Sequence, residues 1–508
     1  MNKTTLKGLL TFLCVFCVFI VNAQQQLKNN TKAIENNSTN APLELTLESQ
    51  KSLEETGYVK CASVEMHERR MQNTTAKQQY EEAFENWLAP LIEAKRQEIA
   101  QAKANGTFKK AIVNVPIIFH IITSGSGATN LSSTLVQAQI DQLNLDFSNN
   151  AGSTHPAAAD AEIVFVPAVI DPAGNLLPEP GINRVTTFGA GPFDTTDFDL
   201  GDGGLEIKPA TIWDRSLYAN VWTANISGGI LGYAQFPSNS TLPGFPADGG
   251  SELNDGVVIG YGTVGSVANP GSAPPYNLGR TLTHEIGHWI GLRHIWGDTS
   301  NCTGGANAGD YCADTPDSTS ANYGCATGTD KCTGDGLGND MIENYMDYSD
   351  DSCMNIFTAD QVLRVATVLE NADGISNLPN SNTANASPTI SFTNLAGNQG
   401  EGSDCSFTDV TVSLNIPIGP SANATANFSV SGGTAASGVD FDLMTSNLSF
   451  AAGATSSQDI TIRVYNDDFV EGDETIIVNF TVNANGGDAE AGNNTFTLTI
   501  NDDDVAIS

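Results

Sequence analysis

Basic residues are scarce in this 508-residue sequence, which has 22 Lys and Arg against 58 Asp and Glu and a formal net charge of −36. The deficit lies in residues 111–508, which contain 8 bases and 46 acids. Nucleic-acid phosphates would be repelled by such a chain, so the composition argues against a nucleic-acid partner. An acidic surface instead favours solubility outside the cell and the binding of cations by carboxylates.

Long apolar runs are also lacking. The one candidate, Leu9–Val21, has thirteen residues with one polar interruption, which is too short for a membrane span. It follows Lys3 and Lys7 and precedes the small residue Ala23, an order that predicts a secretory signal peptide over residues 1–23. The protein is therefore expected to be secreted and to have no membrane span.

Cysteine is infrequent in the body of the chain. Seven of the nine Cys lie beyond the leader, and five of these fall within residues 302–353. This cluster contains no C-x-x-C pair, so a second, structural zinc site is disfavoured. In the oxidising compartment that a signal peptide implies, the cluster predicts disulfides.

Histidine is scarce as well, yet three of the six His fall within twelve residues, in the pattern H-E-x-x-H-x-x-G-x-x-H. His284 and His288 lie one helical turn apart on one face, where both can bind a zinc ion. Gly291 accepts a positive φ, so the helix can end there and the chain can bring His294 to the metal. The carboxylate of Glu285 then lies where it can accept a proton from water beside the zinc.

H-E-x-x-H alone also occurs by chance on amphipathic helices, but the added Gly and His make the pattern much more specific. The segment H-E-I-G-H-W-I-G-L-R-H-I-W-G-D is followed by D-Y-C-A-D-T-P and then by N-Y-M-D-Y-S-D-D-S-C-M-N-I-F-T. These three segments resemble the pappalysin family of metzincins, and its ulilysin-like bacterial members in particular, over Ile112–Val368. The resemblance implies an α+β metzincin-type zinc peptidase domain with a mixed sheet, an active-site helix and a C-terminal helix. It further implies that Met346 lies beneath the metal and that Tyr348 hydrogen-bonds the developing oxyanion.

The resemblance also bears on the loop after the third histidine. It implies that Asp310, Asp314 and Thr315 bind calcium, whose preferred ligands are oxygens on a flexible loop. A solvated, turn-rich loop without calcium is the alternative interpretation. The family pattern also implies the disulfides Cys302–Cys332 and Cys325–Cys353. Cys312 has no partner in that scheme, and Cys405 has none either.

Residues 24–110 are expected to be a pro-segment, because they are rich in Lys, Arg, Glu, Gln and Asn, unlike the rest of the chain. A thiolate is a strong zinc ligand, and the resemblance implies that Cys61 caps the metal in the latent form. A disulfide from Cys61 to another Cys is the alternative. Helical spacing predicts a helix over Tyr80–Ala104 that breaks or kinks at Pro90. The dibasic pair Lys109-Lys110 marks a site near which release would free the enzyme.

Residues 111–371 are expected to form the catalytic domain. Ile230–Ala234 resembles the edge strand of the family, to which a substrate can add as a further strand. His120 is expected to be a core histidine rather than a metal ligand. Strands are predicted at Ile112–Ile122, Ala161–Ile170, Tyr218–Thr223, Ile230–Ala234 and Asp255–Tyr261, and helices at Ser133–Phe147, from near Leu278 and at Phe357–Asn371.

Residues 372–386 are predicted to be a polar linker, and residues 387–508 an all-β, antiparallel sandwich with strands such as Ser456–Tyr465 and Thr475–Val482. The acidic runs that begin at Asn466 and Asn501 resemble those of the Calx-β domain. By that resemblance calcium binds at one end of the sandwich, and a spacer or adhesive module without calcium is the alternative. The candidate calcium ligands are Asp467, Asp468, Asp502 and Asp503, with Glu401, Asp440 and Asp504.

The sequence therefore predicts a secreted zinc endopeptidase that is made as a zymogen and hydrolyses protein or peptide substrates. Its expected cofactors are one catalytic Zn²⁺ and structural Ca²⁺. The alternative is a calcium-dependent adhesion or matrix protein whose peptidase domain is inactive or incidental. The retention of Glu285 with all three histidines favours the enzyme.

Overall fold

The structure is a computed structural model that divides into two compact units, Met1–Ala384 and Asn385–Ser508. Several sequence predictions fall outside the residues it describes: the signal peptide, Lys110, Cys405, Asp467, Asp468, Asp503 and Asp504. The described residues are 43–71, 74–109, 112–199, 204–237, 252–298, 302, 309–384, 388–401, 406–466 and 470–502.

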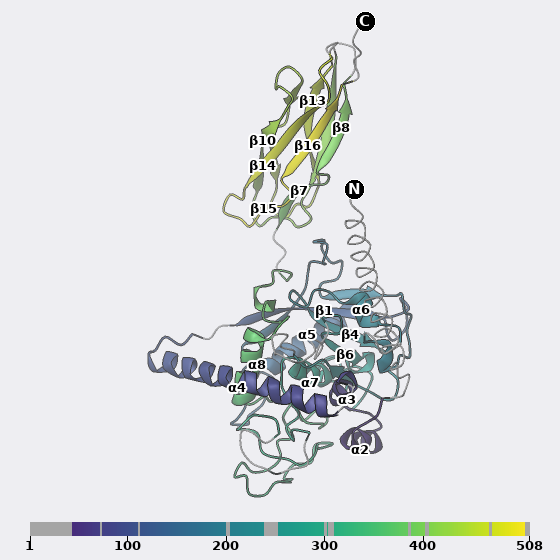
Figure 1. Ribbon diagram of the computed structural model, residues 1–508, viewed down its shortest axis with the longest axis vertical. Coiled ribbons are helices and arrows are strands. Elements are labelled where there is room, and N and C mark those ends of the chain that lie inside the picture. The colour runs from purple at the N-terminus through teal and green to yellow at the C-terminus, as the bar shows by residue number, and fades with distance from the viewer. Residues whose placement is uncertain are drawn as a thin grey trace, which may run out of the picture. The chain divides into compact units, whose positions relative to one another are not determined.

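The first unit is built on a mixed sheet with the strand order β2-β1-β4-β6-β5, and β3 also pairs with β1. Figure 1 labels three of these strands, β1, β4 and β6. All strand pairs are parallel except β5 with β6, which are antiparallel. The strand β5 stands last in the order and therefore forms one edge of the sheet. The mixed sheet predicted from the sequence is confirmed. Its strands are β1 (Val113–Ile122), β2 (Ile163–Pro167), β3 (Ile182–Val185), β4 (Ala219–Ala224), β5 (Gly232–Ala234) and β6 (Val257–Gly260).

The central strand β1 is buried from Val115 onward, as a continuous apolar run in a covered parallel sheet should be. Within this run, His120 is fully buried and its ring nitrogens bond to Asn220 and Asn183. Burial lowers the pKa of His120 to about 4. It is therefore a neutral core histidine.

Seven described helices accompany this sheet. The helix α5 begins at its N-cap Ser132, whose hydroxyl accepts a hydrogen bond from the Leu135 amide. The helix α8 begins with a capping box formed by Thr358 and Gln361. The described helices are α2 (Leu47–Thr56), α3 (Ser63–Arg70), α4 (Thr74–Ala104), α5 (Ser133–Phe147), α6 (Ile207–Thr211), α7 (Arg280–Trp289) and α8 (Ala359–Asn371).

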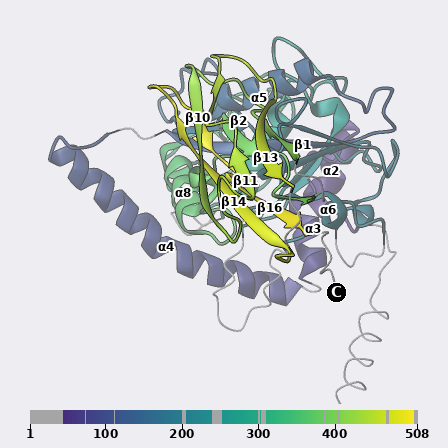
Figure 2. The same ribbon diagram turned by 90° about the horizontal axis from the view of Figure 1, so that it is seen from above.

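The segment before residue 110 lies on the catalytic part and supplies α2, α3 and α4. The long helix α4 crosses α8, and its C-terminal turns extend beyond the rest of this unit (Figures 1 and 2). Of the predicted break or kink at Pro90, the break is wrong, because α4 continues through this residue. Proline has no backbone N–H, so the carbonyl of Asn86 lacks its helical hydrogen-bond donor. Because Pro90 and Asn86 are both exposed, water can donate to this carbonyl instead.

The second unit is a sandwich of two five-stranded sheets, β12-β10-β14-β16-β8 and β11-β13-β9-β7-β15. Apolar side chains of both sheets alternate inward and form a separate core. The expectation of a wholly antiparallel sandwich is wrong at two edges, because β8 pairs with β16, and β15 with β7, in parallel. Between β7 and β8 the chain crosses from one sheet to the other, and β8 then pairs with the last strand of the new sheet.

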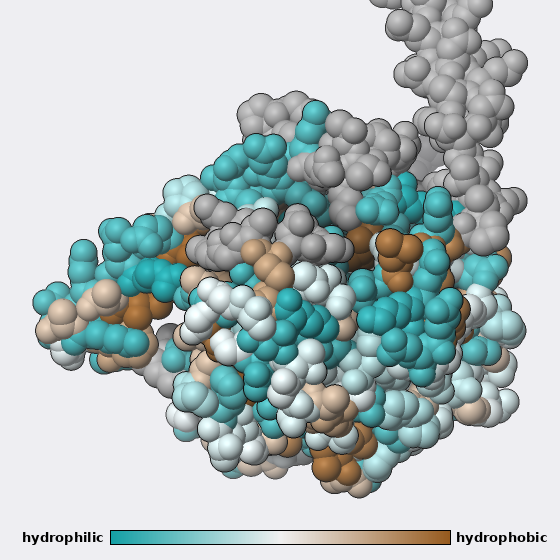
Figure 3. All heavy atoms as spheres, turned by 90° about the horizontal axis from the view of Figure 1, so that it is seen from below, coloured by the Kyte–Doolittle hydropathy of each residue, from teal (hydrophilic) through white to brown (hydrophobic). Residues whose placement is uncertain are grey.

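The strands of this sandwich are β7 (Thr389–Phe392), β8 (Ala396–Gly400), β9 (Phe407–Asn415), β10 (Ala424–Gly433), β11 (Phe441–Leu443), β12 (Asn447–Phe450), β13 (Gln458–Tyr465), β14 (Glu474–Asn483), β15 (Glu490–Ala491) and β16 (Thr495–Asn501). Among the described residues, no helix combines the length and apolarity needed to cross a membrane. The face drawn in Figure 3 is largely hydrophilic, with apolar atoms in separate patches.

Candidate metal centre and catalytic site

Three histidines converge beneath the edge strand. His284 and His288 lie one turn apart on α7, which packs against β5 and β6. The helix ends at Trp289, and Gly291 has a φ of 98°, the left-handed conformation that an L side chain rarely adopts. The chain turns there and brings His294 back to the other two rings. All three imidazoles are fully buried.

The outward-facing nitrogen of each ring has a hydrogen-bond acceptor. The Nδ1 atoms of His284 and His288 lie 2.7 and 2.9 Å from the carbonyl oxygens of Tyr345 and Leu292. A carbonyl can only accept, so each Nδ1 carries the proton and each Nε2 presents a lone pair. The Nδ1 of His294 lies 2.6 Å from the carboxylate of Asp298, which favours the same tautomer.

The three Nε2 atoms face one another at 3.1, 3.1 and 3.3 Å. Three lone pairs without a proton between them repel one another, so this arrangement needs a cation. Two nitrogens that bind one tetrahedral zinc at about 2.0–2.1 Å stand about 3.3 Å apart. Burial also lowers the pKa of His284 and His288, which keeps both rings neutral. The residues present therefore fit a zinc ion.

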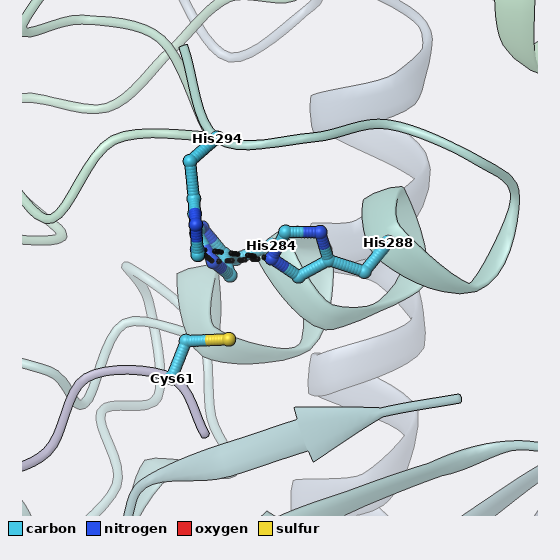
Figure 4. A group of neighbouring side chains, drawn as sticks. All are labelled: Cys61, His284, His288 and His294. Carbon is cyan, nitrogen blue, oxygen red and sulfur yellow. Dashed lines mark hydrogen bonds between the residues drawn. The ribbon is translucent and has the colours of Figure 1, made fainter. Parts of the chain in front are cut away.

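Cys61 of the N-terminal segment completes the donor set. Its sulfur points toward the three rings (Figure 4), and the four ligand atoms all lie within 4.8 Å of one another. Burial and the nearby Glu285 carboxylate raise the pKa of the Cys61 thiol well above its ordinary value. Cys61 is free in the structure and does not form the alternative disulfide.

Glu285 faces the same point from α7. Its Oε2 accepts hydrogen bonds from the Ser63 hydroxyl at 2.8 Å and from the Cys61 thiol at 3.4 Å. Burial raises the pKa of Glu285 to about 8, against the opposing effect of these two hydrogen bonds. Ser63 also accepts a hydrogen bond from the Ala234 amide of β5, so it links the N-terminal segment to both the carboxylate and the edge strand.

Met346 and Tyr348 lie on the other side of the histidines. Met346 is fully buried, and a Cβ on Gly287 would stand 2.5 Å from its sulfur. A side chain at 287 would therefore force this methionine to shift under α7, a constraint that the sequence reading missed. The ring of Tyr348 contacts His284 and His294, and its hydroxyl donates to the Cys61 carbonyl at 3.3 Å. It is thus placed to donate to a peptide carbonyl in the cleft.

The sequence reading also missed Lys60 and Asp351. The Lys60 ammonium lies 3.1 Å from Asp351 Oδ1 and 4.0 Å from the centre of the Tyr276 ring, with both charged side chains fully buried. The other oxygen of Asp351 accepts the amides of Leu278 and Arg280, which fixes it at the start of α7. For Lys60, the only signal in the sequence was its position directly before Cys61.

The structure has the two disulfides that the resemblance implies, Cys302–Cys332 and Cys325–Cys353, while Cys312 is free and buried. In the proposed calcium loop, Asp310 accepts hydrogen bonds from the Thr315 hydroxyl and the Cys312 amide. Asp314 accepts from the Asp360 amide of α8. Burial raises the pKa of Asp310 to about 7.

A second acidic group lies in the sandwich. Carboxylate oxygens of Asp440, Glu471 and Glu474 lie within 4.8 Å of one another. Of the predicted calcium ligands there, Asp502 is nearby, because it accepts the amides of Glu471 and Gly472. The sequence reading named Asp440 as a candidate ligand, and it singled out the acidic run from Asn466 that contains Glu471 and Glu474 without naming these two residues as ligands.

We expect Asp298→Ala to weaken zinc binding about 10- to 100-fold, because a ligand histidine loses the group that orients it. Competition with a chromogenic chelator would measure the change. Asp298→Asn keeps an acceptor oxygen at Nδ1 and should lose much less affinity. Equal affinity of the alanine variant and the wild type would contradict the orienting role.

Comparison with known proteins agrees with this geometry. The family model described as pregnancy-associated plasma protein-A matches residues 206–370, and the Calx-beta domain model matches residues 385–504. An extracellular metalloprotease of Verticillium alfalfae is 32% identical over 271 residues, which are 53% of this chain and 80% of that protein. The chain belongs to this family of metallopeptidases.

An extracellular metalloprotease of Sordaria macrospora is 30% identical over 277 residues, covering 54% of this chain and 81% of its own length. Among solved structures, a promirolysin mutant of Tannerella forsythia is 31% identical, covers 64% of this chain and 97% of its own, and has a TM-score of 0.49. The metallopeptidase domain and the Calx-β domain expected from the sequence are thus both confirmed.

Proposed function

We propose that this family member is a secreted zinc endopeptidase that is made as a latent precursor. The observation that carries the proposal is the convergence of three unprotonated Nε2 atoms and the Cys61 sulfur on one point, with Glu285 beside it. His284, His288 and His294 would hold the zinc, which when bound would act as a Lewis acid toward water and the scissile carbonyl.

The side chains around the metal supply the remaining chemistry. Glu285 takes a proton from the attacking water and later gives it to the leaving amine. The hydroxyl of Tyr348 donates a hydrogen bond to the developing oxyanion, the role it has toward the Cys61 carbonyl in the latent form. The edge strand β5 aligns the substrate backbone.

Latency follows from the position of the N-terminal segment, which fills the same cleft. Its backbone bonds to the residues before and at the start of β5, with Val59 N donating to Gly229 O and Ala62 N to Gly232 O. Ser63 and Cys61 bond to the catalytic carboxylate. Release of residues up to about Lys110 would uncover the site, and Lys109 is exposed, in keeping with cleavage near it.

The buried ion pair of Lys60 with Asp351 indicates one substrate preference, because Lys60 directly precedes Cys61. With the pro-segment removed, Asp351 Oδ1 would lose its cationic partner, while its other oxygen would stay bonded to the start of α7. A carboxylate fixed in this way needs a cationic partner. We therefore propose that the mature enzyme prefers Lys or Arg at the position next to the scissile bond.

Asp351→Asn is expected to lower kcat/KM for a lysine-containing peptide about tenfold relative to the same peptide with methionine there. The ratio within one enzyme sample cancels any change in the fraction folded. Asn keeps an acceptor oxygen for the α7 amides, so the helix start is preserved. An unchanged ratio would exclude Asp351 as the specificity residue.

The peptidase assignment is tested by casein digestion with the zinc-loaded full chain after limited proteolysis near Lys110. We expect hydrolysis that stops when a zinc chelator is added and returns when zinc is restored. No hydrolysis by the processed, zinc-loaded protein would contradict the assignment and favour the adhesion alternative.

Calcium is proposed as a ligand of the second unit. Burial and the neighbouring carboxylate of Asp440 raise the pKa of Glu474. The negative charges of Asp440, Glu471 and Glu474 therefore repel one another without a cation to balance them. A bound divalent cation would relieve this repulsion. Calcium at Asp310, Asp314 and Thr315 stays a proposal that rests on the resemblance.

A further inference from the structure

Two arginines of the catalytic part lie next to each other at the cleft. Residues 111–508 contain only 8 bases, so a pair of adjacent guanidinium groups is not expected from composition. Arg293 immediately precedes the third zinc histidine, and Arg364 projects from α8. Both rest on the ring of Tyr311, at 5.8 and 5.5 Å from its centre.

The catalytic part itself holds both side chains in place. The Nε of Arg364 donates to the Gly291 carbonyl at 2.6 Å, so its guanidinium is fixed independently of the pro-segment. Arg293 also lies over Phe236, 5.5 Å from the ring centre. These contacts stay in place when the pro-segment leaves, and they preorganise the two cations.

The anionic partners of these arginines come from the pro-segment. Glu85 of α4 accepts a bidentate pair of hydrogen bonds from Arg364, at 2.6 and 2.7 Å, and a further one from Arg293 at 3.2 Å. Glu81, one turn earlier on α4, accepts from Arg293 at 3.1 Å. Among the described residues, these are the only carboxylates within ion-pair distance of either arginine.

Nearby acids of the catalytic part are already engaged. Asp298 accepts from the Nδ1 of His294, and Asp310 accepts from Thr315 and the Cys312 amide. Loss of α4 therefore removes the paired carboxylates and uncovers both guanidinium groups. Two adjacent cations held in place without their carboxylates attract a replacement anion, and a carboxylate can bind them by charge-assisted hydrogen bonds.

The arginine pair lies along the path of a chain bound in the cleft. The pro-segment contacts β5 and its flanks at both ends, because Val59 N donates to the Gly229 carbonyl and the Tyr80 hydroxyl donates to the Pro237 carbonyl. Asp351, the partner of Lys60, binds the start of α7, and Arg364 binds Gly291 just after its end, so His284 and His288 of α7 lie between the two charged sites. The Phe236 ring touches both His288 and Arg293, so a single ring separates the arginine from a metal ligand.

We propose that Arg293 and Arg364 form a carboxylate-binding subsite of the mature enzyme, which takes an Asp or Glu side chain of the substrate. The subsite lies just beyond the C-terminal end of α7, whereas Asp351 lies at the start of this helix. In the latent form Glu81 and Glu85 occupy it as substitutes for the substrate side chain. This inference rests on the proposed peptidase function and adds a second charge requirement to it.

The test uses the processed, zinc-loaded full chain and quenched fluorescent peptides that carry lysine next to the scissile bond. A single Glu or Gln is moved through the three or four positions on either side of that bond. We expect about tenfold higher kcat/KM for Glu over Gln at one position on the side away from the lysine. The ratio should fall toward one in Arg293→Gln, and Arg293→Glu should favour Lys at that position instead.

The matched control is Arg463→Gln in the second unit, where the arginine pairs with the exposed Asp409, and its Glu/Gln ratio should equal that of the wild type. Because each ratio is taken within one enzyme sample, partial unfolding of a variant does not affect it. Cleavage without any Glu preference, or a preference that persists in both Arg293 variants, would overturn the subsite. Absence of cleavage of every peptide would overturn the proposed function itself, and the subsite with it.

Discussion

Replacement of Glu285 by alanine is expected to lower kcat/KM on casein-derived peptides about 10²- to 10⁴-fold, the usual contribution of a general base. Glu285 is the carboxylate that faces the metal position, and its hydrogen-bond donors Cys61 and Ser63 belong to the proposed pro-segment. Zinc content should stay at one per chain, because the three histidines and their Nδ1 acceptors are unchanged. Metal analysis and peptide kinetics on the processed chain measure both quantities.

The matched control for this variant is Glu370→Ala. Glu370 is an exposed residue of α8 that pairs with Lys95 of the pro-segment, so the processed enzyme should keep wild-type kinetics. Wild-type hydrolysis by Glu285→Ala would remove Glu285 from the mechanism. Loss of zinc together with activity would instead assign it a structural role.

The second large effect is expected for Cys61→Ser in the unprocessed chain. With cobalt in place of zinc, the wild type should show a near-ultraviolet thiolate-to-cobalt absorption band that the variant lacks. The unprocessed variant should hydrolyse a short peptide at least about tenfold faster than the unprocessed wild type. This corresponds to about 1.4 kcal/mol of lost binding between the pro-segment and the catalytic part. The ion pairs Lys60–Asp351 and Glu85–Arg364 still hold the pro-segment, so activity should stay below that of the processed enzyme.

Cys312→Ser is the control. Cys312 is the other free cysteine among the described residues, and it is not part of the metal-binding group formed by Cys61 and the three histidines. Its cobalt spectrum and latency should match the wild type. Persistence of the thiolate band in Cys61→Ser would mean that the sulfur does not bind the metal. If the thiolate band disappears in Cys61→Ser and activity does not rise, the ion pairs Lys60–Asp351 and Glu85–Arg364 are sufficient to keep the enzyme latent.

The metal site was readable from the sequence because its geometry is local. An i, i+4 pair of histidines on a helix and a glycine at the turn set the relation of three ligands within eleven residues, whatever surrounds them. The same holds for α5, whose bounds match the sequence prediction, because its cap and apolar spacing are local signals. Cys61 was named only through the family resemblance.

Contacts between segments far apart in the chain were not readable. Asp351 lies 291 residues from Lys60, and Glu85 lies 279 residues from Arg364, so no spacing rule connects them. The course of α4 through Pro90 also escaped prediction, because it depends on which face of the helix meets water. The parallel edge pairs of the sandwich depend on where the chain crosses between sheets.

The sequence by itself predicted a zinc site at three histidines with a candidate base beside it, because short-range helical geometry carries that information. Its motifs determined the two kinds of domain through their family resemblance. Tertiary structure alone decided how the N-terminal segment lies in the cleft and which charges it covers there. The physical reason is that an ion pair needs only a few ångströms between two side chains. In a folded chain this proximity is set by packing, and sequence separation does not limit it.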